Sequence, residues 1–227
     1  MSNTVTISDQ TYNVLKNYCG INSSILIREG SVLKTISVGE NAIAEYVGEE
    51  TFPKTFGIYD LNQFLAGLSI LKDTKDNNPV LEFGNDSYVT IKGNGRSIKY
   101  YFSSPEITLK AAPDKEIQFP DSELEFTISE GRLKSIHQIA GVYGLPDLAF
   151  ISKDGNVSLK VCDREDETSN VYDMTVQGTA TGDFQFYMKI DNIRVMDASY
   201  KVNISSRLIT RWQHQNIDLK YYIALEP

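Results

Sequence analysis

The chain has 227 residues, 41% of them hydrophobic and 23% charged, and its formal net charge is −8. This composition is typical of a globular protein with one large domain or two of ordinary size. The negative total argues against a surface coated with positive charge for nucleic acid, although a local positive lining stays compatible with it. No apolar run approaches the roughly 18 residues of a membrane span, and no secretory signal begins the chain. We therefore expect a cytoplasmic protein without membrane contact, in which Cys19 and Cys162 stay reduced.

The first part of the chain alternates predicted strands with an amphipathic helix. A short strand at residues 4–7 precedes Ser8 and Asp9, which are residue types that favour a helix N-terminus. The helix is expected to end near residue 18, and its apolar side consists of Thr11, Val14, Leu15 and Tyr18. Three strands joined by tight turns then follow at residues 21–28, 31–38 and 41–47.

Residues 56–71 combine a strand and a second helix without a loop between them. Asp60 follows a run of β-forming residues and can cap a helix by accepting from the first-turn N–H groups. Apolar residues then recur at helical spacing on one side: Leu61, Phe64, Leu65, Leu68 and Leu71. The opposite side is uncharged and carries Asn62, Gln63, Ala66 and Ser69. This pattern predicts a core helix packed on a sheet.

Two or three more strands, at residues 80–83, 88–92 and 97–102, are expected to complete the first half. Gly93-Asn94-Gly95 is expected to be the hairpin turn between the last two, because it lacks the spacing of a phosphate-binding loop. Residues 103–120 contain three prolines and no helical period, which indicates an extended connector. We place the domain boundary near Ala111, so that the predicted domains are residues 1–110 and 111–227.

The second half begins in the same manner as the first. A strand at residues 125–128 leads into a helix whose apolar side is Leu133, Ile136, Ile139 or Ala140, and Tyr143. Strands are predicted at residues 148–152, 157–162, 171–179 and 183–188, followed by a short helix around residues 191–196. The last strands are predicted at residues 200–204, 208–213 and 217–225.

The two halves also share short sequences in the same register. Thr6-Ile7-Ser8-Asp9 recurs as Thr127-Ile128-Ser129-Glu130, and Ile98-Lys99-Tyr100-Tyr101-Phe102 recurs as Leu219-Lys220-Tyr221-Tyr222-Ile223 at the same offset. Four such pairs occur in order, which favours a duplication. The predicted class is α+β, with two duplicated domains, each of antiparallel sheets with two amphipathic helices.

No constellation of residues favours an enzyme. His137 and His214 are the only histidines, and neither a Ser/His/Asp order nor a paired-cysteine metal site appears. The acidic residues 163–167 lack the ligand alternation of a calcium loop and are expected to form an exposed turn. We therefore predict no catalytic activity, cofactor or metal. On these patterns alone, a β-rich scaffold or phage structural protein is an open alternative.

The layout resembles that of the DNA sliding clamps, the processivity factors of replicative polymerases. Local sequence is most similar to the clamps of T-even-type phages, in Leu15-Lys-Asn-Tyr-Cys-Gly-Ile-Asn-Ser-Ser-Ile-Leu26, in residues 56–71 and in Tyr221-Tyr-Ile-Ala-Leu-Glu226. The resemblance implies a homotrimeric ring with clamp-domain helices lining the hole and duplex DNA threading it without sequence preference. It also implies a clamp loader, a DNA polymerase and possible late transcription factors as partners.

Within that resemblance, three sets of residues are candidates for function. The candidate DNA-facing set consists of the cations on predicted helices, namely Lys16, Lys72, Arg132, Lys134, Lys189 and Arg194. The resemblance implies a partner pocket near the connector and the C-terminus, formed by Leu109, Ile117, Phe119, Leu225 and Pro227. The expected subunit interface joins two edge strands through Arg96, Ile98, Tyr100 and Phe102 of one chain and Val171, Met174 and Val176 of the next.

Overall fold

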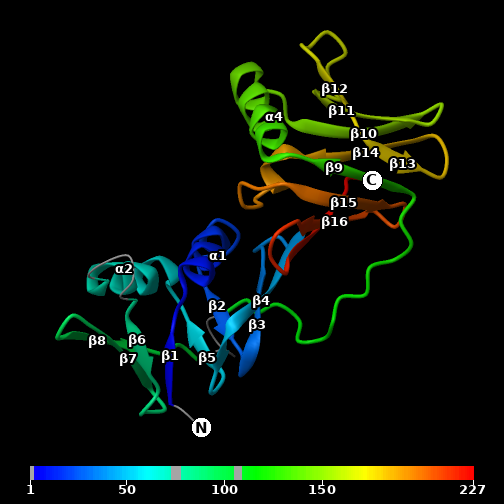
Figure 1. Ribbon diagram of the computed structural model, residues 1–227. Coiled ribbons are helices and arrows are strands. Elements are labelled where there is room, and N and C mark those ends of the chain that lie inside the picture. Colours follow the sequence, from blue (N-terminus) through cyan, green and yellow to red (C-terminus); the bar gives the residue numbers. More distant parts are fainter. Residues whose placement is uncertain (1–2, 73–77, 105–108) are drawn as a thin grey trace. The chain divides into compact units, whose positions relative to one another are not determined.

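The computed structural model describes residues 3–72, 78–104 and 109–227 (Figure 1). The chain falls into two compact units, which divide between Asp114 and Lys115. We call residues up to Asp114 unit 1 and the remainder unit 2. This division lies a few residues beyond the expected boundary near Ala111.

Unit 1 contains a four-stranded antiparallel sheet in the order β1-β6-β7-β8. Its strands are β1 (Thr4–Thr6), β6 (Val80–Glu82), β7 (Tyr88–Gly93) and β8 (Arg96–Tyr101). The unit also contains the pair β2 (Ile25–Ile27) and β5 (Phe56–Ile58), and the hairpin β3 (Gly30–Ile36) and β4 (Ala42–Phe52). Strand β4 continues beyond its predicted end, because the alternation of more and less exposed residues persists as far as the buried Phe52.

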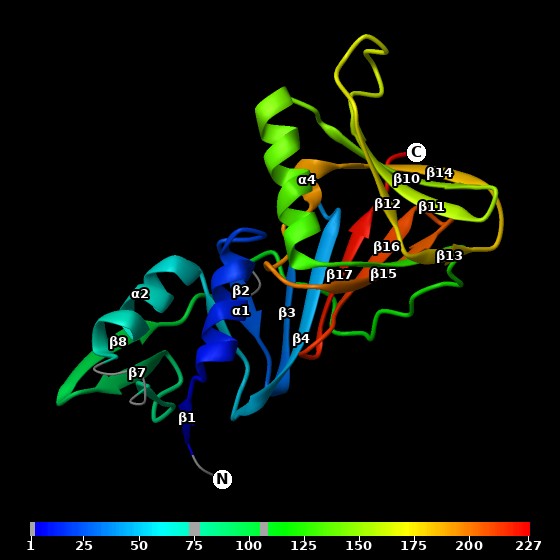
Figure 2. The same ribbon diagram turned by 45° about the horizontal axis from the view of Figure 1, so that its top comes forward.

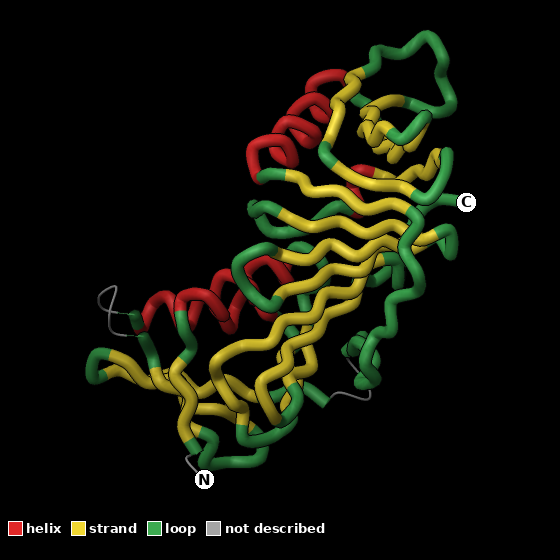
Figure 3. The backbone as a smooth tube through the Cα atoms, turned by 45° about the vertical axis from the view of Figure 1, so that its right-hand side comes forward, coloured by secondary structure: helices red, strands yellow, loops and turns green. Residues whose placement is uncertain are grey.

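Two helices of unit 1, α1 (Asp9–Cys19) and α2 (Leu61–Leu71), lie side by side (Figures 1 and 2). The Ser8 hydroxyl accepts a 3.1 Å hydrogen bond from the Thr11 N–H and caps α1, and Asp60 accepts one of 3.0 Å from the Gln63 N–H and caps α2. Figure 3 shows both helices in red against the strands of the unit. Their predicted apolar sides are buried, so the prediction of these helices is confirmed.

Aromatic side chains fill the core at the strand that precedes α2. Phe56 lies 5.9 Å from Phe52, 5.1 Å from Phe83 and 5.0 Å from Phe102, measured between ring centroids. Such tilted pairs stabilise a core beyond their area alone. The hairpin predicted between β7 and β8 is confirmed, with Asn94 at φ 50° and Gly95 at φ 67° in its turn.

Unit 2 contains two antiparallel groups of strands. The first has the order β12-β11-β10-β14, formed by β12 (Tyr172–Val176), β11 (Asn156–Cys162), β10 (Asp147–Lys153) and β14 (Phe184–Lys189). The second has the order β13-β9-β15-β16-β17, formed by β13 (Gly178–Ala180), β9 (Leu124–Ile128), β15 (Tyr200–Ser205), β16 (Ile209–His214) and β17 (Leu219–Ala224). The helix α4 (Glu130–Tyr143) packs on β11. The core of the unit is centred on the fully buried Trp212.

Three predictions for unit 2 are wrong in part. The strand expected over residues 171–179 is two strands of different groups, and Gly178 comes so close to the Glu125 carbonyl that a Cβ there would collide with it. In α4, Leu133, Ile136 and Ala140 are buried as predicted, but Tyr143 is 53% exposed in the last turn. That turn ends at Gly144, whose φ is 67°.

The helix expected around residues 191–196 is also wrong, because only the 3₁₀ turn η1 (Ile190–Asn192) forms there. Asp, Asn and β-branched residues have low helix propensity, and a helix this short cannot offset the cost of nucleation. Among the described residues unit 2 therefore has one α-helix and not the two predicted for each domain.

Candidate nucleic-acid interface and assembly edges

The outward sides of α1 and α2 form a polar surface on unit 1 with little charge. The exposed residues of α2 include Asn62, Gln63, Ala66, Ser69 and Ile70, all of them uncharged. On α1, Lys16 is exposed and supplies the positive charge of that side of the helix. Such a surface can lie against a polyanion without binding any one phosphate tightly.

Lys72 follows the last residue of α2, and its ammonium forms an ion pair with Asp9 in the first turn of α1. This contact joins the beginning of one helix to the end of the other. It also means that the positive charge of Lys72 is balanced within unit 1. A small cavity of about 100 Å³ lies beside this pair, lined by Ile7, Asp9, Tyr12, Leu68, Ser69, Lys72, Asn78 and Pro79.

Helix α4 presents the cations of unit 2. Arg132 and Lys134 are both exposed there, and the Arg132 guanidinium donates a 3.1 Å hydrogen bond to the Thr175 carbonyl. The Lys134 ammonium lies 2.6 Å from a Glu130 carboxylate oxygen and 3.4 Å from one of Asp197. The hydrogen bond to Glu130 raises the pKa of Lys134, so this side chain remains charged over the physiological range.

The sequence predicted that Lys189 lies on a helix, and this prediction is wrong. Lys189 is the last residue of strand β14. It lies opposite Asp147 of β10, and its ammonium is 2.8 Å from the Asp147 carboxylate, which is fully buried. The hydrogen bond to Asp147 raises the pKa of Lys189. A buried carboxylate requires such a partner, so Lys189 has a structural role that could not be detected from sequence patterns.

Arg194 lies in the segment after η1 and is exposed. Its Nε–H donates a 3.1 Å hydrogen bond to the Asp191 carbonyl. The contact between Lys134 and Asp197 joins this segment to α4. In unit 1, Lys72 and Lys16 thus lie at opposite ends of α1. In unit 2, α4 with Arg132 and Lys134 contacts the segment that carries Arg194.

The residues predicted for a partner pocket occupy different surroundings in the two units. In unit 1, Leu109 packs so closely on Gly57 that a Cβ there would lie 2.5 Å from its Cδ1. In unit 2, Ile117 and Phe119 are half-buried, and the Arg211 guanidinium lies 4.8 Å from the centroid of the Phe119 ring. This cation–π contact was not predicted from the sequence, since the two residues are far apart in the chain.

The C-terminal residues of the predicted pocket are held by backbone contacts. Leu225 is buried, and its N–H donates a 2.9 Å hydrogen bond to the Leu208 carbonyl. Pro227 is exposed, and its carbonyl accepts a 3.5 Å hydrogen bond from the Arg164 guanidinium. Arg164 in turn lies over the Tyr187 ring at 5.7 Å from its centroid.

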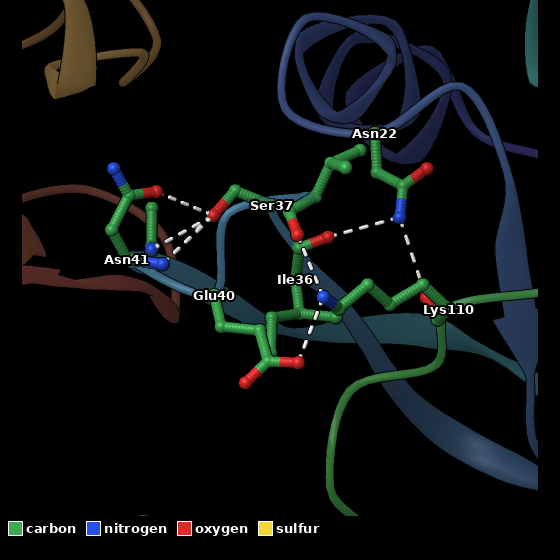
Figure 4. Close-up of polar contacts among 8 residues, drawn as sticks. Asn22, Ile36, Ser37, Glu40, Asn41 and Lys110 are labelled. Atoms are coloured by element: carbon green, nitrogen blue, oxygen red, sulfur yellow. Dashed lines mark hydrogen bonds and ion pairs between the residues drawn. The ribbon is translucent and has the colours of Figure 1, made fainter.

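The part of the connector that belongs to unit 1 is fastened by side chains that the sequence did not single out. The Asn22 amide donates to the Ile36 carbonyl at 2.9 Å and to the Lys110 carbonyl at 3.3 Å (Figure 4). The Lys110 ammonium lies 2.6 Å from the Val38 carbonyl and 2.8 Å from Glu40. Arg28 donates a 2.8 Å hydrogen bond to the Ala112 carbonyl.

Both strands predicted for the subunit interface lie at sheet edges. β8 is the last strand of its sheet in unit 1, and β12 is the first of its group in unit 2. Four of the predicted interface residues are half-buried, namely Ile98, Tyr100, Phe102 and Met174. Arg96 and Val171 are exposed, and Val176 is buried. Each edge therefore leaves backbone groups and partly exposed apolar side chains available for pairing.

Antiparallel sheets with helices packed against them occur in both units, and comparison with solved structures identifies this arrangement as the DNA clamp fold. Over 100% of both chains, the structure is similar to the proliferating cellular nuclear antigen of Entamoeba histolytica, with a TM-score of 0.75 at 14% identity. It is also similar to the PCNA of Thermococcus kodakaraensis, with a TM-score of 0.72 at 12% identity over 98% of this chain and 100% of that one. At these identities the likeness establishes the fold alone.

Sequence comparisons identify the relatives within that fold. A family model described as DNA polymerase processivity factor matches residues 8–105. The chain is 28% identical to the sliding clamp of Vibrio phage KVP40, over 97% of this chain and 98% of that protein. It is 24% identical to the sliding clamp of Escherichia phage RB69, over 97% and 96% respectively. The resemblance to the phage sliding clamps is confirmed.

Two further observations concern the part of the chain that the structure describes. No helix in it is both long enough and apolar enough to cross a membrane. It also contains no group of three or more His, Cys, Asp or Glu side chains that could hold a metal ion.

Proposed function

We propose that the chain is a sliding clamp that encircles duplex DNA as a homotrimeric ring and tethers a replicative DNA polymerase for processive synthesis. The observation that carries the proposal is the similarity to phage sliding clamps over 97% of the chain, together with the clamp fold. In the proposed ring, residues 1–110 and 111–227 are the two clamp domains. The function does not require catalysis by the clamp itself.

The charge on the helices supports this function. Lys16, Arg132 and Lys134 are exposed on helices of a chain whose formal net charge is −8. Duplex DNA carries a negative charge about every 1.7 Å of its axis, so a few cations attract it without reading its sequence. We propose that Lys16, Lys72, Arg132, Lys134, Lys189 and Arg194 face the DNA, with the largest contributions from the exposed members of this set.

The free edges of β8 and β12 support head-to-tail closure of the ring. When two different edges meet between copies, each copy is rotated relative to the last, and a ring forms if these rotations add up to a full turn. We propose that the interface includes Arg96, Ile98, Tyr100 and Phe102 of one copy and Val171, Met174 and Val176 of the next.

The partners follow from the proposed tether. We propose that a polymerase, a clamp loader and, for late genes, transcription factors dock on a surface that includes Leu109, Ile117, Phe119, Leu225 and Pro227. The exposure of Pro227 and the partial exposure of Phe119 support a role in binding. For a phage-encoded clamp, this activity belongs in the cytoplasm of the host cell.

The decisive experiment measures DNA synthesis by the cognate polymerase on a primed circular template, with the clamp loader and ATP. We expect the chain to increase product length about tenfold or more, because a tethered polymerase rebinds faster than it diffuses away. Cutting the circle after loading should release the ring and abolish the gain. An equal gain without loader or ring closure would contradict the proposal, and so would no gain at all.

A further inference from the structure

The edges of β8 and β12 carry rows of side chains that complement each other residue by residue. This inference rests on the proposed ring, in which the two edges meet between copies of the chain. Cross-strand neighbours in an antiparallel pair point to the same face of a sheet. The known partner of each edge strand therefore reveals which of its side chains face the core.

On β8, the inner row consists of Ile98 and Tyr100, which lie opposite the buried Ile91 and Val89 of β7. The Tyr100 hydroxyl donates a 3.0 Å hydrogen bond to the Asp60 carbonyl next to α2, so this face is the one that α2 covers. The outer row is exposed and consists of Ser97, Lys99 and Tyr101.

On β12, the inner row consists of Tyr172 and Met174, which lie opposite the buried Val161 and Leu159 of β11. The outer row consists of Asp173 and Thr175, both exposed, and Val171 is 48% exposed just before the strand. Each edge thus has a half-buried apolar row on the inside and a polar row with one charge on the outside.

We propose that β8 of one copy pairs antiparallel with β12 of the next in the register that places Lys99 opposite Asp173. Two further matches then follow from the alternation of the strands. Ile98 lies opposite Met174, which extends the inner apolar row across the seam. Tyr101, which is 66% exposed in the single chain, lies opposite Val171.

Other registers lose these matches. A shift of one residue would place the inner row of one strand beside the outer row of the other. A shift of two residues places Lys99 opposite Val171 or Thr175 and leaves Asp173 without its partner. Antiparallel pairing is favoured because the sheets that contain β8 and β12 are antiparallel, and because a parallel pairing would separate Tyr101 from Val171.

The charges around the two edges point to a second copy of this chain as the occupant. β8 carries Arg96 and Lys99, whereas β12 carries Asp173 and follows the acidic residues 163–167. Among the described residues, Lys99 lies 4.9 Å from the centroid of the Tyr88 ring and forms no ion pair, so its ammonium remains available. Opposite charges directly across a strand pair stabilise it, and like charges oppose it.

Disulfide trapping in the full-length chain tests the register. Ser97 and Thr175 lie directly opposite each other in it, within the Cα–Cα range of about 4.4–6.8 Å that a disulfide requires. We expect Ser97→Cys combined with Thr175→Cys to give a covalently closed trimer under mild oxidation. The matched control combines Ser97→Cys with Gln177→Cys, two residues further along the chain and just past the end of β12, where about 7 Å of extended chain separates the partners.

The possible outcomes separate the register from the ring. If light scattering shows a trimer but the 97/177 pair links in place of 97/175, or neither pair links, this register is overturned and the proposed ring stands. If every variant and the unaltered chain remain monomeric at all concentrations, the ring itself fails.

A charge exchange gives an independent readout. Lys99→Glu or Asp173→Lys alone should raise the concentration for half-assembly roughly fivefold or more, and the combined exchange should restore it. The control is Lys201→Glu, on β15, whose native partner is Glu125 of β9, and it should leave assembly unchanged. Failure of the combined variant to recover would contradict the pairing of Lys99 with Asp173.

Discussion

The carboxylate of Glu50 joins strand β4 to the first turn of α1. Its two oxygens accept 2.6 Å hydrogen bonds from the Ser8 N–H and from the Thr11 hydroxyl. Burial pushes the pKa of Glu50 upward, but these hydrogen bonds outweigh it, and the pKa of Glu50 is lowered overall. A carboxylate at a helix N-terminus is also favoured by the helix dipole. The ionised form of one side chain therefore helps fix where α1 begins.

Replacing Glu50 with Gln should lower the free energy of unfolding by about 1–3 kcal/mol near neutral pH, since hydrogen bonds to a charged group are lost. Because the folded pKa of Glu50 is lowered, its contribution is present above the ordinary glutamate value of about 4.3 and is lost as the pH falls through the folded pKa. Urea unfolding at several pH values measures this difference. Glu49→Gln, at the exposed neighbouring position, should have no such effect. A loss for Glu50→Gln that did not change with pH would contradict the role of the ionised carboxylate.

At the scale of elements, the end of β7 approaches the last turn of α2 closely in unit 1. A Cβ at Gly93 would collide with the Leu71 carbonyl at the last turn of the helix. Neither the period of the helix nor the hairpin pattern around Gly93 could have indicated this contact. Glycine fits at position 93 because it has no side chain to collide with the helix, and the same residue precedes a tight turn.

We expect Gly93→Ala to destabilise the protein by roughly 1–3 kcal/mol, since backbone must move to admit the methyl group. Gly84→Ala is the matched control, because a Cβ there meets nothing within 4 Å, and it should be neutral or slightly stabilising. The midpoint of chemical unfolding compares the two variants. Equal midpoints would mean that the helix end yields at little cost.

Among the helices, the one that the sequence predicted best has both a capping residue and a sustained apolar period. Asp60 and the leucines of α2 satisfy both conditions, and the helix forms where predicted. Residues 191–196 satisfy neither, and only a 3₁₀ turn forms. The pairing of Lys189 with Asp147 was beyond sequence reasoning, because it depends on which strands become neighbours and the two residues are distant in the chain. The same holds for Asn22 and Arg28, whose partners lie in the connector.

At the scale of the whole molecule, a chain of formal charge −8 carries exposed cations on its helices. In the proposed ring, acidic outer surfaces would repel DNA while the lining attracts it weakly. Salt weakens this attraction, because each phosphate that a cation neutralises releases counterions, and with few cations in the lining the dependence on salt should be shallow. Sequence reasoning identified the exposed cations from helical spacing, but could not tell that Lys189 serves a buried partner.

Replacing both Lys134 and Arg194 with Glu should shorten the products of loader-dependent synthesis several-fold at physiological salt, since two attractive charges become repulsive. Assembly, measured by light scattering, should change little, because both side chains are exposed. The melting temperature should fall modestly, because Lys134→Glu replaces ion pairs with Glu130 and Asp197 by like-charge contacts. Lys153→Glu, at an exposed strand end, reverses a charge away from the helices and serves as the control. Product lengths equal to those of the unaltered chain would exclude these two residues from the lining.

The uncharged outward side of α2 has a consequence for motion along DNA. Asn62, Gln63, Ala66 and Ser69 offer dipoles and a methyl group but no fixed charge that could hold a phosphate in one position. The energy of a ring lined by such helices would vary little as the duplex advances or rotates through it. Viscous drag from the solvent would then set the rate at which the ring diffuses along DNA. The ring would not have to leave a binding site at each base-pair step.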